Sequence, residues 1–173
     1  MNIEFNPVDT IGAGAFGQPG ARTFVIQARK GDAQVSVLVE KEQVALLAVE
    51  AEQFLDRIDA DEPGLEEWPG TATTAPVEED EPLFRARLIG IGYDPERQLV
   101  LIELREEAMD EDDEDETPVV DEPEGHIAKL YATRAQIRAM VAQGTEAVSA
   151  GRPKCELCDF PMDPDGHICP RWN

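Results

Sequence analysis

The 173-residue chain has no run of apolar residues that approaches the length of a membrane span, for which about 20 such residues are needed. Its N-terminus also lacks the basic segment followed by an apolar segment that marks a secreted protein. We therefore expect a cytoplasmic protein that has no membrane partner.

Cysteine is scarce, and its distribution is uneven. The chain has three cysteines, an odd number, and all lie near the C-terminus as Cys155, Cys158 and Cys169. A disulfide framework needs paired cysteines and an oxidising compartment. The pattern instead indicates a reduced cluster that holds a metal ion.

Basic residues are few, with 15 Lys and Arg against 37 Asp and Glu and a net charge of -22. Two stretches without any basic residue, 61–81 and 106–124, hold 20 of the acidic residues. The rest of the chain is therefore close to neutral, and the acidity belongs to two predicted loops, at about 60–82 and 106–124. A molecule with this charge repels phosphate backbones, which disfavours nucleic acid as a partner.

Apolar periodicity predicts the folded elements. Runs of β-branched and aromatic residues predict strands, and apolar residues at intervals of three and four predict helices. The sequence thus predicts a short strand at 3–6, a hairpin of strands 23–28 and 34–39, a helix over 41–58, a second hairpin of strands 83–93 and 98–104, a strand over 126–131, and a helix that begins after Thr133 and ends before Gly151.

These elements predict an α+β domain over residues 1–150, with an antiparallel sheet that carries two helices on one face. The order hairpin then helix occurs twice, and Gln43 and Gln136 would occupy the same position in the first turn of the two helices. A loose internal duplication is therefore an open interpretation.

Residues 151–173 are predicted to be a separate zinc-binding tail. Cys155-Glu-Leu-Cys158 places two thiolates on a tight knuckle, while His167 and Cys169, two apart in an extended segment, point to the same side. Residues 163–166, Asp-Pro-Asp-Gly, are typical of a reversing turn. The two ligand pairs would therefore face each other across a hairpin, as a tetrahedral set of three thiolates and one imidazole.

Zinc suits this set, because it accepts mixed sulfur and nitrogen ligands and its closed four-ligand shell is structural. The alternatives are three exposed cysteines in an unfolded tail, a redox-active CxxC, and iron. A redox CxxC normally opens a helix, which Pro153 and Pro161 oppose. An iron–sulfur cluster usually takes four thiolates.

Two other patterns carry less weight. Gly12, Gly14 and Gly17 match the GxGxxG string of nucleotide-binding loops, but that string acts by opening a helix, and a strand is predicted to follow instead. A flexible loop or a close-packed turn is the preferred interpretation. His126 lies alone at the head of a strand without an evident Ser or Cys partner. We therefore assign no catalytic and no cofactor-binding residue.

Four segments resemble the actinobacterial family called domain of unknown function 3090. They are residues 3–9, 13–24 and 39–44 and the ending 151–171, of which the ending is the most specific. Family members tend to carry Gly after the second cysteine, where this chain has Asp159, and Gly12 is not typical. The resemblance implies a cytosolic protein restricted to actinobacteria, with no established activity.

The leading hypothesis is an accessory protein that docks on a protein partner, because a metal module alongside no convergent acid, base or nucleophile usually presents a surface. The alternative is an enzyme or ligand-binding protein for a small phosphorylated metabolite. The cationic residues that would serve this alternative are Arg22, Arg29, Arg85 and Arg87.

Overall fold

The computed structural model describes residues 1–64, 75–106, 125–151, 153–160, 162 and 168–171. Within these ranges the chain forms strands and helices in two runs, each of four strands and then a helix. The elements are β1 (Asn2–Phe5), β2 (Thr10–Phe16), β3 (Thr23–Lys30), β4 (Ala33–Val39), α1 (Lys41–Asp61), β5 (Phe84–Arg85), β6 (Leu88–Asp94), β7 (Leu99–Arg105), β8 (Ile127–Ala132) and α2 (Arg134–Ser149).

The strands form two four-stranded sheets, in the orders β1-β8-β7-β6 and β2-β3-β4-β5. In each sheet three consecutive strands pair antiparallel, and a short strand from the other part of the chain joins the last of them in parallel. β1 pairs with β8 and β5 pairs with β4. Each sheet is therefore completed by the strand that precedes the three-stranded part of the other sheet.

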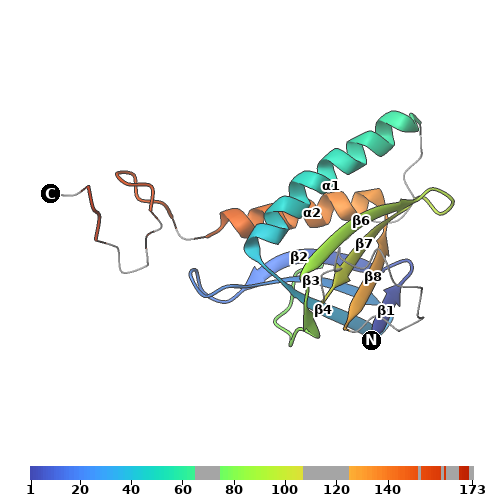
Figure 1. Cartoon of the computed structure of the whole chain (residues 1–173), viewed down its shortest axis with the longest axis horizontal. Coiled ribbons are helices and arrows are strands. Elements are labelled where there is room, and N and C mark those ends of the chain that lie inside the picture. The colour runs from blue at the N-terminus through green and yellow to red at the C-terminus, as the bar shows by residue number, and fades with distance from the viewer. Residues whose placement is uncertain (65–74, 107–124, 152, 161, 163–167, 172–173) are drawn as a thin grey trace, which may run out of the picture.

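The predicted α+β class with two helices is confirmed, and the helices lie side by side on the same side of the sheets (Figure 1). The sheet arrangement differs from the prediction, because there are two sheets and each contains a parallel pair. The segment 83–93, predicted as one strand, divides into β5 and β6. Ala86 N donates to Leu38 O at 2.9 Å in one sheet, and Arg87 N donates to Arg105 O at 2.7 Å in the other, so the chain crosses between sheets there.

The glycine-rich segment near the N-terminus forms strand β2, where the sequence predicts a loop or a turn. Its glycines allow another segment to lie close against the strand. A Cβ on Gly12 would lie 2.9 Å from Ala75 O, and a Cβ on Gly14 would lie 2.9 Å from Val77 Cγ2. Close packing against residues 75 and 77 explains why positions 12 and 14 are glycine. The GxGxxG string therefore does not form a phosphate-binding loop that opens a helix.

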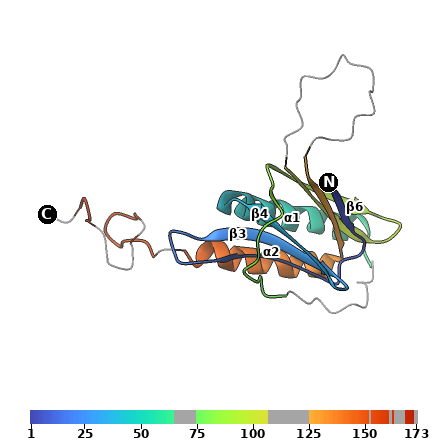
Figure 2. The same cartoon turned by 90° about the horizontal axis from the view of Figure 1, so that it is seen from below.

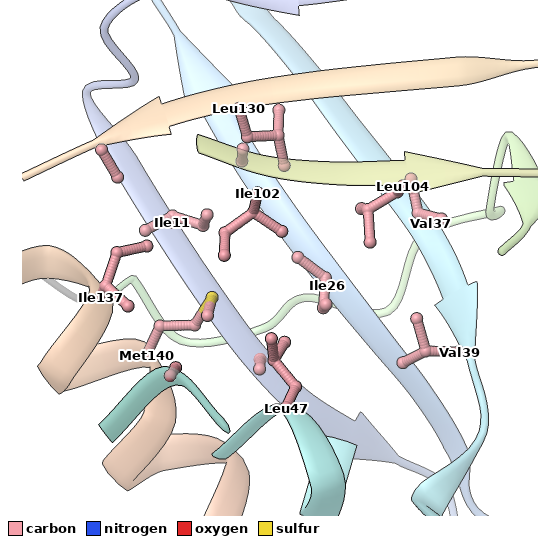
Figure 3. Close-up of a cluster of buried hydrophobic side chains, with 14 of the residues drawn as sticks. Ile11, Ile26, Val37, Val39, Leu47, Ile102, Leu104, Leu130, Ile137 and Met140 are labelled. Carbon is pink, nitrogen blue, oxygen red and sulfur yellow. The ribbon is translucent and has the colours of Figure 1, made fainter. Parts of the chain in front are cut away.

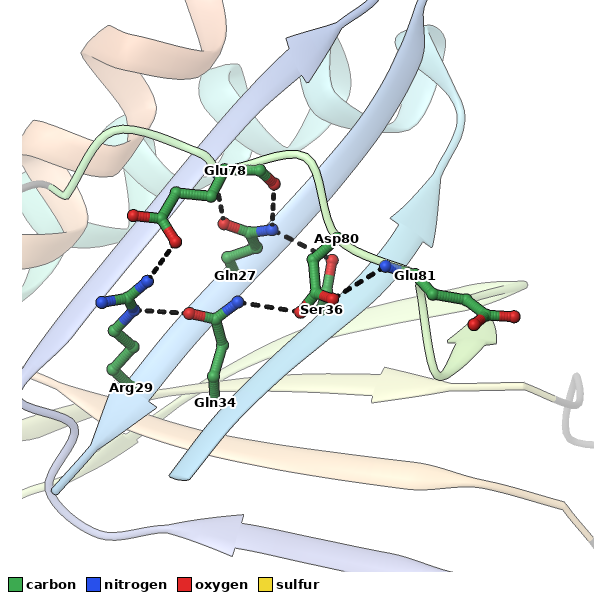
Figure 4. A network of polar contacts seen from close by, with 7 residues as sticks. All are labelled: Gln27, Arg29, Gln34, Ser36, Glu78, Asp80 and Glu81. Atoms are coloured by element: carbon green, nitrogen blue, oxygen red, sulfur yellow. Dashed lines mark hydrogen bonds and ion pairs between the residues drawn. The ribbon is translucent and has the colours of Figure 1, made fainter. Parts of the chain in front are cut away.

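Residues 75–82, which we call the strap, lie across the outer face of the β2-β3-β4 sheet (Figure 4). The buried Gln27 amide is held by the strap backbone, since its Nε2 donates to Glu78 O at 2.6 Å and its Oε1 accepts from Glu78 N at 2.9 Å. Part of the predicted acidic loop 60–82 is thus packed on the sheet. The ranges 65–74 and 107–124 lie outside the described residues. Further strap contacts are Arg29 Nη2 to Glu78 Oε2 at 2.5 Å and Gln34 Nε2 to Asp80 Oδ2 at 2.9 Å.

The hydrophobic core lies between the two sheets and beneath the two helices (Figure 3). Alternate residues of the central strands point inward, as the period of a strand requires, and the helices add one apolar face each. The burial of these side chains supplies the main driving force for folding. Core residues include Ile11, Ile26 and Val37 from one sheet, Ile102, Leu104 and Leu130 from the other, Leu47 from α1, and Ile137 and Met140 from α2.

Both helices begin in the same way. Gln43 Oε1 accepts from Glu40 N at 2.7 Å, and Gln136 Oε1 accepts from Thr133 N at 2.9 Å, which satisfies a backbone donor at each start. Each glutamine also donates from Nε2 to a carbonyl that precedes a strand of the other half, Ala86 O or Asp9 O. The predicted equivalence of Gln43 and Gln136 in the helical first turn is confirmed, while internal duplication of the sequence stays a prediction.

In the described part of the chain, neither helix is long and apolar enough to span a membrane.

The close approach of the strap to β2 gives a first prediction. Gly14→Ala should lower the free energy of unfolding by about 1–3 kcal/mol, because the added methyl overpacks against Val77. In a Val77→Ala background the same change should cost less, because the 2.9 Å contact with Cγ2 is removed and only the 3.2 Å contact with Cβ remains. Urea denaturation of the two single variants and the double variant measures this coupling.

Gly92→Ala is the matched control, since its Cβ would lie no closer than 3.8 Å to another residue. It should change the stability by less than about 0.5 kcal/mol. Equal losses for Gly14→Ala with and without Val77 would show that the strap does not constrain β2.

Candidate metal centre

The three cysteines come together in the C-terminal segment. The Sγ atoms of Cys155, Cys158 and Cys169 lie within 4.8 Å of one another, and Cys155 and Cys169 are buried with 7% of each residue exposed. The Sγ atoms of Cys155 and Cys169 are 3.9 Å apart, far beyond the S–S bond of about 2.05 Å. The sequence-predicted gathering of these three thiols is thus present in the structure.

Backbone hydrogen bonds build the knuckle around the first two cysteines. Asp159 N donates to Cys155 O at 2.9 Å, and Cys155 N donates to Phe160 O at 2.9 Å. Met162 N then donates to Pro153 O at 2.8 Å. The chain therefore reverses tightly after Cys158, as a CxxC metal knuckle requires.

Asp159 closes this knuckle in a left-handed backbone conformation, with φ of 60°. Glycine adopts this region without strain, whereas Asp and Asn do so at a smaller cost than other residues. The geometry gives a physical reason why glycine suits the position after the second cysteine, and why aspartate is a tolerable replacement.

A contact that the sequence did not predict joins the last residues to the knuckle. Arg171 Nη1 donates to Leu157 O, between the two cysteines of the CxxC, at 3.0 Å. This bond helps to hold the segment that carries Cys169 against the knuckle. No motif marks it, because an arginine that caps a carbonyl has no fixed spacing from it.

The separation of two of the sulfurs matches that around a tetrahedral metal ion. Two thiolates that bind one zinc ion at about 2.3 Å in a tetrahedron have sulfurs about 3.8 Å apart, and the observed separation of Cys155 and Cys169 is 3.9 Å. Desolvation raises the pKa of the Cys158 thiol, and neighbouring Cys169 and Cys155 add to the rise, while a backbone hydrogen bond from Phe160 opposes it. A cation would offset this cost by stabilising the thiolates. The three cysteines could therefore hold a metal ion.

The predicted fourth ligand, His167, and the predicted turn at 163–166 lie outside the described residues. Of the segment between the knuckle and Cys169, only Met162 and Ile168 are described. The assignment of Cys155, Cys158, His167 and Cys169 as a complete ligand set stays a prediction.

His126, which we set aside as a catalytic candidate, is held by contacts within the body. Its Nδ1 lies 2.6 Å from Glu106 Oε2, and its backbone N donates to the same oxygen at 3.0 Å. Its ring stacks on Phe84 with centroids 5.5 Å apart. These contacts join the end of β7 to the start of β8, which is a structural role. Hydrogen bonds from His126 hold the pKa of the Glu106 carboxyl below its ordinary value.

The four arginines considered for anion binding do not form one site. Arg29 donates to Glu78 and Gln34 on the outer sheet face, and Arg87 lies where the chain crosses between the sheets. Arg22 and Arg85, by contrast, line the same pocket near the start of α1. β5 ends at Arg85, so Arg85 and Arg87 do not lie in one strand.

An α+β body with a C-terminal cluster of three thiols defines the class of protein, a small domain with a candidate metal centre. The model of the family described as Protein of unknown function (DUF3090) matches residues 3–169, and the chain belongs to this family. No curated protein and no solved structure matches the chain.

The Glu106–His126 contact predicts a pH dependence. A carboxyl whose pKa is lowered in the folded state stabilises the fold at pH values above its ordinary pKa, here 4.5. This stabilisation is lost as the pH falls through the lowered pKa. We expect wild type to have a higher urea midpoint than Glu106→Gln near neutral pH, with the difference shrinking in acid. Glu52→Gln, at an exposed position of α1, is the control. A difference between wild type and Glu106→Gln that is equal at every pH would refute the role of the Glu106 carboxylate.

Proposed function

We propose that this protein is a cytoplasmic accessory protein whose tail, residues 151–173, forms a structural zinc module that docks on a protein partner. The observation that carries the proposal is the surface of the tail. Three large apolar side chains around the thiol cluster are exposed, Leu157 by 52%, Phe160 by 59% and Ile168 by 98%. Exposed apolar groups that gather on a small module mark an interaction surface more often than single ones do.

The tail extends away from the body beyond the end of α2, in both views of the molecule (Figures 1 and 2). Its apolar side chains are therefore not covered by the described part of the sheets or helices. A module of this size is too small to form its own hydrophobic core, so a metal ion would supply the folding free energy and leave these side chains free for a partner.

Zinc is the ion that the ligand chemistry favours. Thiolates select zinc, copper(I) or iron–sulfur clusters over the oxygen-preferring cations, and a reducing compartment keeps such thiols available. With His167 as the fourth ligand the site is closed to substrate, and its role is structural. The body over residues 1–150 would then keep its own fold when the metal is removed.

The zinc assignment predicts one zinc ion per chain by elemental mass spectrometry of the purified protein. Cys155→Ser and His167→Ala should each lose the zinc, because a shell of three ligands binds it far more weakly, while the body still unfolds cooperatively. His126→Ala is the matched control, since His126 is the other of the two histidines in the chain, and it should retain the zinc.

Two results would contradict this assignment. Iron, or no metal, in the wild-type protein would exclude a zinc module. Full zinc retention in His167→Ala would show that another group completes the shell.

Zinc loss on acidification is also expected, because the ligands must be deprotonated to bind.

The docking assignment is tested by capture from a lysate of the organism that carries the gene. Replacing Leu157, Phe160 and Ile168 together by serine should abolish retention of the partner while the zinc content stays unchanged. Leu46→Ser with Val49→Ser is the matched control, because these residues of α1 are also exposed, by 59% and 53%. A partner that the tail variant still retains would place the docking surface elsewhere.

A further inference from the structure

A second feature of the molecule is a pocket of about 620 Å³ beside the start of α1. Its walls come from the start of β3, the end of β4, the residues around β5, and the chain that leaves α2. Its volume lies within the range of about 300–1,000 Å³ that is usual for small-molecule sites. None of its lining residues belongs to the thiol cluster.

The pocket has a charge opposite to that of the protein. Four basic side chains line it, Arg22, Lys41, Arg85 and Lys154, against one acidic side chain, Glu40. The whole chain has 37 acidic and 15 basic residues. A local excess of positive charge in such a chain needs a physical reason, because like charges in one pocket repel each other.

Internal ion pairs do not neutralise the excess. Arg85 pairs with Glu40, and both side chains are more than half exposed. Lys41 and Lys154 have no acidic partner within 4 Å among the described residues. The pocket therefore retains two lysines whose charges the described part of the protein leaves uncompensated.

Arg22 is partly anchored and partly unsatisfied. Its Nη1 donates to Ala147 O, near the end of α2, at 3.2 Å, which fixes the guanidinium in the pocket wall. Its Nε is buried and has no hydrogen-bond partner among the described residues. A guanidinium has five N–H donors, so the bond to Ala147 leaves other donors of Arg22 for a ligand in the pocket.

Lys41 Nζ lies close to the chain that leaves α2, because a Cβ built on Gly151 would be 3.4 Å from it. Lys41 on the body and Lys154 on the tail both line the pocket. Apolar residues, among them Phe24 and Val39, line the rest.

We propose that this pocket binds the phosphate group of a small phosphorylated molecule. Lys41 and Lys154 neutralise the phosphate, Arg22 supplies a positioned guanidinium, and the apolar wall contacts the organic part. Charge-assisted hydrogen bonds from Lys and Arg to phosphate are stronger than neutral ones, and a lysine ammonium binds phosphate as a compact point charge. The net charge of -22 repels polyanions, which favours a small ligand over a nucleic acid.

The test is isothermal titration calorimetry of the full-length, metal-loaded protein with inorganic phosphate and with glycerol 3-phosphate. A titration with sodium chloride of equal ionic strength is the control. We expect saturable binding of both at one site per chain, with glycerol 3-phosphate tighter. Lys41→Gln with Lys154→Gln should weaken both at least about tenfold. Arg57→Gln with Lys129→Gln, which removes the same charge outside the pocket, should leave both dissociation constants within about twofold.

Three outcomes would overturn the proposal. They are no binding to wild type beyond that of chloride, equal binding of phosphate to the pocket variant and to wild type, and binding of phosphate without binding of glycerol 3-phosphate. Zinc content and thermal unfolding of both double variants are measured in parallel, so that a loss of binding is not a loss of structure. The test is independent of the docking surface, because it leaves Leu157, Phe160 and Ile168 unchanged.

Discussion

The pairing of β1 with β8 and of β5 with β4 is the constraint on which the remaining structure depends. Each half of the chain provides three antiparallel strands and a helix, but the edge of each sheet is closed by a strand from the other half. Each half therefore forms backbone hydrogen bonds with the sheet of the other half, which covers β8 and β4 on one side. We expect the body to fold as one cooperative unit for this reason, with the glutamine at the start of each helix fixing the chain that leads into the opposite sheet.

The sequence predicted the elements whose signal is local. The helix expected over 41–58 is Lys41–Asp61, and the one expected after Thr133 is Arg134–Ser149, because apolar spacing and capping residues lie within each segment. Strand β2 was missed, since glycines normally weaken a strand and the reason for them is a contact with Ala75 and Val77, far along the chain. The two-residue strand β5 has too few residues to carry any period.

The candidate metal centre could be predicted from local spacing, whereas the pocket beside the start of α1 could be predicted only in part. The CxxC spacing predicted that Cys155 and Cys158 would lie together, and the position of Cys169 predicted that it would join them. The pocket could not be predicted in full, because its walls come from five parts of the chain. Arg22 and Arg85 were suspected from the sequence, whereas Lys41 and Lys154 are brought to them by the end of β4 and by the path of the chain after α2. Tertiary structure alone determines this set.

Lys154 lines the pocket and is also the residue that precedes Cys155 in the chain. Its backbone position is therefore set by the same knuckle that orients the thiols. If the two proposed ligands both bind, they do not bind independently, because each reduces the conformational freedom of the segment that the other must order. Thermodynamic reciprocity then requires that metal loading strengthen anion binding by the same factor by which the anion strengthens metal binding.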